Sequence, residues 1–127
     1  MRKAGNLAAS TLDLLVEKVK PGVSTEELDN IAFDYIIRHG GLIAPLFYKG
    51  YPKSVCTSIN HVICHGIPSS RILENGDIVN IDVTVIVDGW HGDTSRMFPV
   101  GKINAKAQKL IDCTFHAMHE GYKCCST

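Results

Sequence analysis

The sequence feature that most constrains the fold is a long β-hairpin near the middle of the chain. Two extended runs, residues 78–87 and 90–98, are separated by Asp88 and Gly89 alone. Asp-Gly between two such runs favours a type I′ turn, whose two central residues have positive φ and whose twist matches that of the strands. A two-residue loop also fixes which residues of the two strands lie opposite each other.

This pairing places two carboxylates on one face of the hairpin. Asp82 lies opposite Ser95 and Thr84 lies opposite Asp93. Because side chains alternate between the two faces of a strand, all four point to the same side, and the two aspartates become diagonal neighbours within reach of a common ion. The other face is expected to join the core, and it carries Val79, Ile81, Val83, Val85, Val87 and Trp90.

The polar face has two interpretations. It can be the solvated side of an antiparallel hairpin, which is a common arrangement. However, Ile78, Ile86 and Met97 lie on the same side, which indicates partial cover. Two covered carboxylates repel each other unless a cation joins them or one is protonated. An aspartate pair with a histidine nearby is therefore also a candidate divalent-metal hydrolase site.

Helical periodicity flanks this β-rich centre on both sides. Residues 1–20 have apolar side chains three and four positions apart. Ser24 and Glu27 form a capping-box pair that begins a second helix. A third helix is expected from about Asn104 to Glu120. The chain is thus predicted to be one α+β domain in which helices flank an antiparallel sheet.

Composition excludes several classes of protein. Hydrophobic residues make up 45% of the 127-residue chain and the formal net charge is +0, so the chain can bury a core and is not intrinsically disordered. Zero net charge gives no reason to expect a nucleic acid or an anionic membrane as partner. No signal peptide or membrane-spanning segment is evident. Five cysteines, an odd number, favour reduced thiols, and the protein is expected in the cytoplasm.

Several longer motifs resemble type I methionine aminopeptidase. They are Tyr51–Asn60, Val62–Pro68 with its Cys-His-Gly-Ile-Pro, Asn75–Thr84 and His91–Ser95. Met1–Gly5 and Lys20–Thr25 are similar to the first helices of that family. The motifs occur in the family's order from Met1 to about Glu120, and several long motifs in order are far more specific than one short pattern.

The resemblance implies a fold and an activity. Type I methionine aminopeptidases have the pita-bread fold of the creatinase and aminopeptidase group. It is an α+β fold of two similar halves, and this chain resembles the N-terminal half. These enzymes use two divalent metal ions (cobalt, manganese, iron, zinc or nickel) to remove the initiator methionine from new polypeptides. The implied partners are peptides with an N-terminal methionine, including nascent chains at the ribosome.

The resemblance also implies roles for six residues. Asp82 corresponds to a terminal metal ligand and Asp93 to the aspartate that bridges both metals. His65 corresponds to a catalytic histidine that contacts the substrate near the scissile bond; without the resemblance it would be interpreted as a loop histidine. Thiol and aromatic surfaces suit a thioether, and the residues that resemble the lining of the methionine side-chain pocket are Tyr48, Tyr51 and Cys56. Plain core packing is the equally weighted alternative for these three.

The chain departs from the family in what it lacks. One histidine and two glutamate ligands belong to the family's second half, so residues 1–127 are expected to be an N-terminal half truncated before it, with an incomplete metal site. Segment 121–127, with adjacent Cys124 and Cys125, is expected to be out-of-frame sequence rather than helix. The half-fold alone is expected to be marginally stable, to self-associate through its uncovered face, or to need a partner. The competing interpretation is a non-catalytic truncated product or pseudoenzyme that binds peptides.

Overall fold

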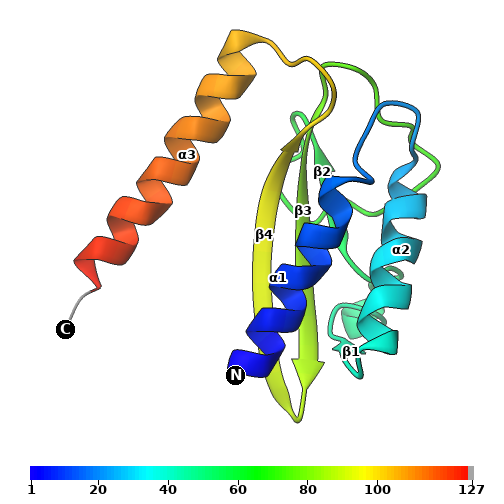
Figure 1. The fold of residues 1–127 in the computed structure, drawn as a ribbon. Coiled ribbons are helices and arrows are strands. Elements are labelled where there is room, and N and C mark those ends of the chain that lie inside the picture. The colour runs from blue at the N-terminus through cyan, green and yellow to red at the C-terminus, as the bar shows by residue number, and fades with distance from the viewer. Residues whose placement is uncertain (126–127) are drawn as a thin grey trace.

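The computed structural model describes residues 1–125, which form three helices and four strands (Figure 1). The helices are α1 (Arg2–Val16), α2 (Thr25–Arg38) and α3 (Ala105–Cys124). The strands are β1 (Leu42–Ile43), β2 (Cys56–Ile59), β3 (Ile78–Val87) and β4 (Trp90–Pro99), and a 3-10 turn, η1, spans Tyr48–Gly50. This arrangement confirms the predicted α+β class, with an antiparallel sheet and flanking helices.

Strand β3 is the centre of the sheet. It pairs along its whole length with β4, and its other edge pairs with β2 and β1 at successive positions. The predicted register is confirmed, since Asp82 lies opposite Ser95 and Thr84 lies opposite Asp93. The two turn residues have φ of 52° and 79°, both positive, as a type I′ turn requires.

Helices α1 and α2 lie side by side over one face of this sheet (Figure 1). The strand residues that face them are completely buried, and they are Val79, Ile81, Val83 and Val85. The helices contribute the apolar residues predicted from their periodicity, namely Ala4, Leu7, Ala8, Leu12, Leu15, Leu28, Ala32 and Ile36. Because apolar burial stabilises by about 25 cal/mol per Å² of area removed from water, this layer is the main source of stability.

Two expectations for this layer are wrong. Trp90 is 57% exposed instead of buried in the core, because the tip of the hairpin extends past the start of α1 (Figure 1). The first helix ends at Val16 and not near Lys20. Pro21 disfavours helical conformation at the residue before it, and the chain uses this segment to turn toward α2.

Side-chain caps begin the second and third helices. The Ser24 hydroxyl accepts a hydrogen bond from the Glu27 N–H at 3.1 Å, as the predicted capping box requires. Asn104 Oδ1 accepts from the Ala107 N–H at 2.8 Å at the start of α3. Each cap satisfies a backbone donor that has no partner inside the helix, so the predicted starts of both helices are confirmed.

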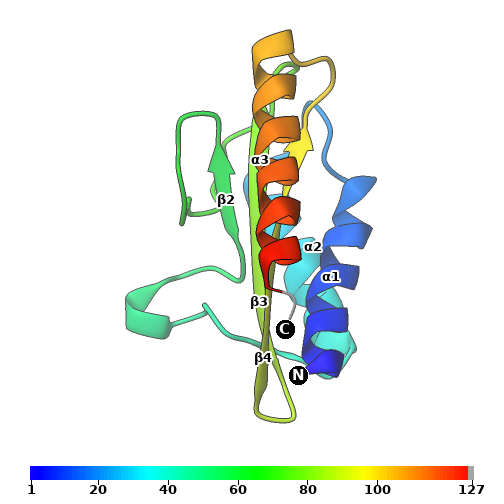
Figure 2. The same cartoon turned by 90° about the vertical axis from the view of Figure 1, so that its left-hand side faces the viewer.

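Helix α3 differs from the other two because none of its residues is buried. It lies beside the β4 edge and diverges from the sheet (Figures 1 and 2). Leu110 and Met118, expected on its apolar face, are exposed. The helix continues to Cys124, so the expectation that residues 121–124 are not helical is wrong, while residues 126–127 of that segment lie outside the described part of the chain. Neither α3 nor another described helix is long and apolar enough to cross a bilayer.

Candidate functional site

A pocket of about 830 Å³ opens on the face of the sheet that α1 and α2 leave uncovered. It lies between the sheet and the loops on either side of β2. All six residues singled out from the sequence line it, namely Tyr48, Tyr51, Cys56, His65, Asp82 and Asp93. The structure therefore brings together side chains that are far apart in the chain, and the role of each stays a prediction.

The two carboxylates line this pocket from neighbouring strands. Asp93 Oδ1 accepts a hydrogen bond from Thr84 Oγ1 at 3.1 Å, across the pair of strands. Burial raises the pKa of Asp82, the negative charge of Asp93 raises it further, and His65 acts in the opposite direction. Two carboxylates held this close favour a cation between them, because a shared positive charge removes their repulsion.

The cover predicted for this face is uneven between the two strands. Asp82 and Thr84 on β3 are half-buried, because β2 lies beside Asp82 and the segment that follows β1 lies beside Thr84. Asp93 and Ser95 on β4 are exposed, because β4 forms the edge of the described sheet. The acid pair thus combines one desolvated carboxylate with one that is open to an incoming ion.

The direction of Asp93 depends on the glycine that precedes it. Gly92 faces α1, and a Cβ at this position would lie 2.3 Å from the Ala4 carbonyl carbon and 2.6 Å from the Gly5 nitrogen. Only glycine allows the helix backbone to come this close to β4. Neighbouring residues of a strand point to opposite faces. Because Gly92 faces α1, Asp93 points to the other side of the sheet, into the pocket.

Cys56 lies directly opposite Asp82 in the ladder between β2 and β3. It is 8% exposed. Burial raises the pKa of its thiol, and the negative charge of Asp82 raises it further, although a hydrogen bond with Tyr51 lowers it. The neutral thiol offers the pocket a polarisable apolar surface and not a thiolate ligand.

Tyr51 fixes the loop that carries His65. The Tyr51 hydroxyl lies 2.9 Å from the Val55 carbonyl oxygen and 3.2 Å from the Gly66 carbonyl oxygen, both of which can accept its proton. Burial raises the pKa of Tyr51, so the hydroxyl stays a donor. Gly66 also accepts from the Thr57 N–H at 2.7 Å and has no room for a Cβ. These bonds hold His65, with its φ of 55°, at the pocket.

Tyr48 lines the pocket from η1. It is 66% exposed, and the Lys49 ammonium lies 5.5 Å from the centroid of its ring. The alternative that Tyr48 is a core residue is therefore wrong. An exposed aromatic ring that lines a pocket is available to contact a ligand.

Other residues of the pocket were not assigned to a site from the sequence. They are Ala44, Pro45, Lys49, Gly50, Pro52, Ile67, Thr84 and His91. His91 lies two residues before Asp93 on the same face of β4, so strand alternation could have identified it. Ile67 and Lys49 carried no comparable signal, because irregular loops position them.

The donor set fits one side of a divalent-metal site. Carboxylate oxygens are hard ligands that suit divalent cations. Within residues 1–125, no group of three or more His, Cys, Asp and Glu side chains is placed to hold an ion. Asp82 and Asp93 supply the two carboxylates on this face of the hairpin, and their role as metal ligands stays a prediction.

Comparisons with known proteins agree with this geometry. The profile of metallopeptidase family M24 matches residues 1–127, so the likeness extends past Glu120, where it was expected to end. The chain is 58% identical over 121 residues to the methionine aminopeptidase of Rickettsia prowazekii and 55% identical over 121 residues to that of Escherichia coli. These alignments include 95% and 94% of this chain but 47% and 46% of the relatives. The chain thus spans about half the length of the curated relatives that it matches.

Solved structures show the same relationship. The crystal structure of the Rickettsia prowazekii enzyme matches with a TM-score of 0.93 at 57% identity, covering 94% of this chain and 48% of that one. Methionine aminopeptidase from Thermotoga maritima matches with a TM-score of 0.92 at 26% identity, covering 94% and 49%. Pyrococcus furiosus prolidase, at 21% identity, shares the fold (TM-score 0.75, covering 91% and 33%). The predicted architecture, one half of the pita-bread fold, is confirmed, and the chain belongs to metallopeptidase family M24, in which it is similar to the methionine aminopeptidases.

Proposed function

We propose that residues 1–127 form the N-terminal half of a methionine aminopeptidase, a metal-dependent enzyme that removes the initiator methionine from new polypeptides. The observation that supports this function is the convergence of Asp82, Asp93 and His65 on one pocket with the thiol and tyrosine side chains. The missing ligands would come from a second half, because the described residues supply only the acid pair.

Each pocket residue has a distinct task in this proposal. Asp82 and Asp93 would hold two divalent ions (cobalt, manganese, iron, zinc or nickel) together with ligands from the second half. When bound, such ions supply a nucleophilic water at neutral pH and a Lewis acid for the peptide carbonyl. His65 donates a ring N–H to the peptide near the bond to be cleaved and orients it above the acid pair. The methionine side chain contacts Tyr48, Tyr51 and Cys56, whose surfaces suit a thioether.

The test is release of methionine from a Met-Ala-Ser peptide with added Co²⁺ or Mn²⁺. We expect turnover when the C-terminal half of the Rickettsia prowazekii relative is added, and loss of turnover with a chelator or in Asp93→Ala. Ser95→Ala, on the same strand but outside the pocket, is the matched control and should keep turnover. Turnover by the chain alone would show that a second half is not needed; no turnover in either arrangement would contradict a catalytic role.

The second candidate is a non-catalytic truncated product or pseudoenzyme that binds peptides. It is favoured by the incomplete ligand set of the described residues beside a pocket that keeps its thiol and tyrosine surfaces. Binding of a Met-Ala-Ser peptide that is insensitive to chelator and to Asp93→Ala would support this candidate. Binding that requires Mn²⁺ would support the metallopeptidase.

The proposal also includes partners and a compartment. Peptides with an N-terminal methionine are the substrates, including nascent chains at the ribosome, and the compartment is the cytoplasm, where the initiator methionine first becomes accessible. The exposed residues of α3 and the open β4 edge support self-association or pairing with a second half. Analytical ultracentrifugation and thermal melts at several protein concentrations test self-association. A monodisperse monomer whose melting temperature is independent of concentration would contradict it.

A further inference from the structure

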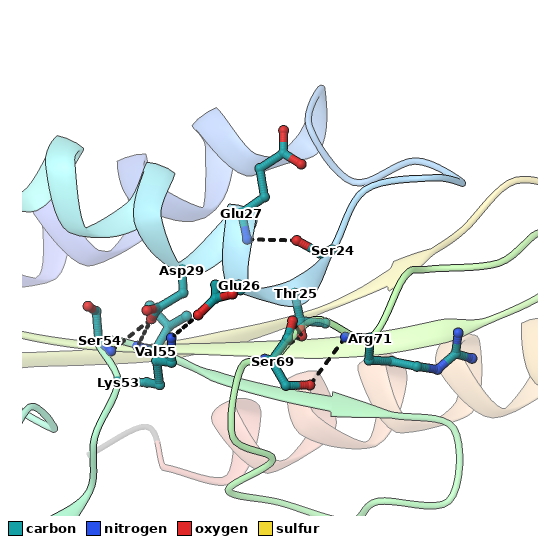
Figure 3. Close-up of polar contacts among 10 residues, drawn as sticks. All are labelled: Ser24, Thr25, Glu26, Glu27, Asp29, Lys53, Ser54, Val55, Ser69 and Arg71. Carbon is teal, nitrogen blue, oxygen red and sulfur yellow. Dashed lines mark hydrogen bonds and ion pairs between the residues drawn. The ribbon is translucent and has the colours of Figure 1, made fainter.

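Asp29 on α2 is a buried carboxylate that does not line the pocket. It is 4% exposed. Its Oδ1 accepts hydrogen bonds from the backbone N–H groups of Ser54 at 2.8 Å and Val55 at 3.0 Å (Figure 3). A buried carboxylate is costly unless it is hydrogen-bonded, and a buried N–H without an acceptor is costly as well. The two bonds therefore fix α2 and the segment before β2 to each other.

The two Asp29 hydrogen bonds are the buried ones in a wider attachment between the start of α2 and two loops (Figure 3). Lys53 Nζ lies 2.7 Å from Glu26 Oε1 in a solvent-accessible ion pair. Thr25 Oγ1 donates to the Ser69 carbonyl oxygen at 3.0 Å and accepts from the Ser69 N–H at 2.9 Å. Because hydrogen bonds are stronger where water is excluded, the Asp29 bonds are expected to contribute most to this attachment.

The backbone that Asp29 holds leads directly into the pocket. Cys56 follows Val55 in the chain, and the Val55 carbonyl oxygen is one of the two acceptors for the Tyr51 hydroxyl. The other acceptor is the Gly66 carbonyl oxygen, in the loop on the far side of β2. Movement of the segment before β2 would therefore displace pocket residues in both loops.

We propose that Asp29 is a positioning residue for the methionine side of the pocket, placing Tyr51, Cys56 and His65 without contacting the substrate. This inference rests on the proposed function. The positions of Asp82 and Asp93 do not depend on Asp29, because they are fixed by the pairing of β3 with β4 and by the packing of α1 against Gly92. Loss of Asp29 therefore disturbs the thioether contacts and leaves metal binding intact.

The first test measures accessibility of the Cys56 thiol by alkylation with iodoacetamide and peptide mapping, with the exposed Cys113 on α3 as internal reference. In Asp29→Ala the alkylation rate of Cys56 should rise about tenfold. The Ser54 and Val55 amides lose their buried hydrogen-bond acceptor, so the segment before β2 opens more often and exposes the thiol. Asp29→Asn keeps an acceptor oxygen and should stay within about twofold of the unaltered chain. Asp34→Ala, an exposed carboxylate on the same helix, is the control.

Amide hydrogen exchange of the unaltered chain tests the inference without a substitution. The Ser54 and Val55 amides should exchange as slowly as those of the β3 ladder, because both donors are buried and bonded. Exchange at the rate of an open loop would overturn the inference, whether or not Asp29→Ala folds. In Asp29→Ala, faster exchange across β3 and β4 in step with Cys56 alkylation would also overturn it, since that pattern indicates general destabilisation.

The functional arm measures binding of methionine amide and of Mn²⁺ separately. Asp29→Ala should weaken binding of methionine amide about tenfold, and Asp29→Asn should restore it, while Mn²⁺ affinity stays unchanged in both. Equal loss of both ligands in Asp29→Ala would overturn the positioning role. If the unaltered chain binds Mn²⁺ but not methionine amide, the proposed function fails, and the alkylation and exchange results decide the role of Asp29 by themselves.

Discussion

The two faces of the β3–β4 hairpin have opposite physical character although the same strands build both. On the face toward α1, Ile81 and Val83 are 0% exposed and pack in the core. On the other face, Asp82 is half-buried and Asp93 is exposed, and both line a pocket. Strand alternation separates the two requirements: one face stabilises the fold, and the other holds charges that repel each other until a cation binds. Substitutions on one face should therefore leave the property of the other largely unchanged.

The largest expected effect is on the core face. Ile81→Ala should lower the free energy of unfolding by about 2–5 kcal/mol, because it leaves a cavity in a fully buried layer. Urea denaturation monitored by circular dichroism measures the change. Ile63→Ala, at a residue that is 94% exposed, should change stability by less than about 0.5 kcal/mol. Similar losses in both variants would contradict the role of Ile81 in the buried core face.

Gly92 is the position where the two faces are coupled. Gly92→Ala should destabilise by about 1–3 kcal/mol, because its Cβ would meet the Ala4 carbonyl and force α1 away from β4. The same movement should weaken Mn²⁺ binding through Asp93. Gly5→Ala, where the new Cβ would have no neighbour within 4 Å, should stabilise by about 0.5–1 kcal/mol. Denaturation and Mn²⁺ titration of both variants test this coupling, and unaltered stability in Gly92→Ala would disprove it.

Asp77, just before β3, should show the opposite response to pH from Asp82. Burial raises its pKa, but bonds from the Glu74 N–H and the Asn60 amide and the charge of Arg71 lower it overall. A lowered pKa in the folded state gives stability that is present above the unfolded value and is lost as the pH falls through the folded pKa. Asp77→Asn should therefore cost about 1.5 kcal/mol near neutral pH and progressively less in acid.

Urea denaturation midpoints of Asp77→Asn and of the unaltered chain, measured from neutral pH into acid, check that prediction. Glu74→Gln keeps the backbone N–H that donates to Asp77 at 2.9 Å and is the matched control. A difference between Asp77→Asn and the unaltered chain that grows as the pH falls would mean that the sign is wrong.

The smallest effect on stability is expected at the pocket, where the substitution should stabilise the chain instead of destabilising it. Asp82→Asn should stabilise the metal-free chain by up to about 1 kcal/mol near neutral pH, because it removes a charge that burial disfavours and that Asp93 repels. The raised pKa of Asp82 means that the unaltered chain gains stability as the pH falls through the folded pKa, and Asp82→Asn should lack this gain.

Mn²⁺ should raise the melting temperature of the unaltered chain and of the surface control Asp88→Asn but not of Asp82→Asn. Equal responses to Mn²⁺ in all three would contradict a metal site at the acid pair.

The sequence by itself predicted the hairpin and the acid pair. A two-residue Asp-Gly turn permits one register, and alternation then places Asp82 and Asp93 on one face, so local geometry is sufficient. His65 and Tyr51 are different, because they lie in loops without a repeating pattern. They were identified by resemblance to a known family, and the tertiary structure placed them at the pocket.

Only the tertiary structure decided which apolar helix faces are buried and which polar side chains form hydrogen bonds to distant segments. Helices α1 and α3 both have apolar residues at helical spacing, yet α1 is buried against the sheet and no residue of α3 is buried. Asp29 looks like an ordinary polar position of an amphipathic helix, but its carboxylate bonds to backbone groups of Ser54 and Val55. Periodicity depends on neighbours within a few residues, whereas burial and hydrogen bonding depend on segments that meet only when the chain folds.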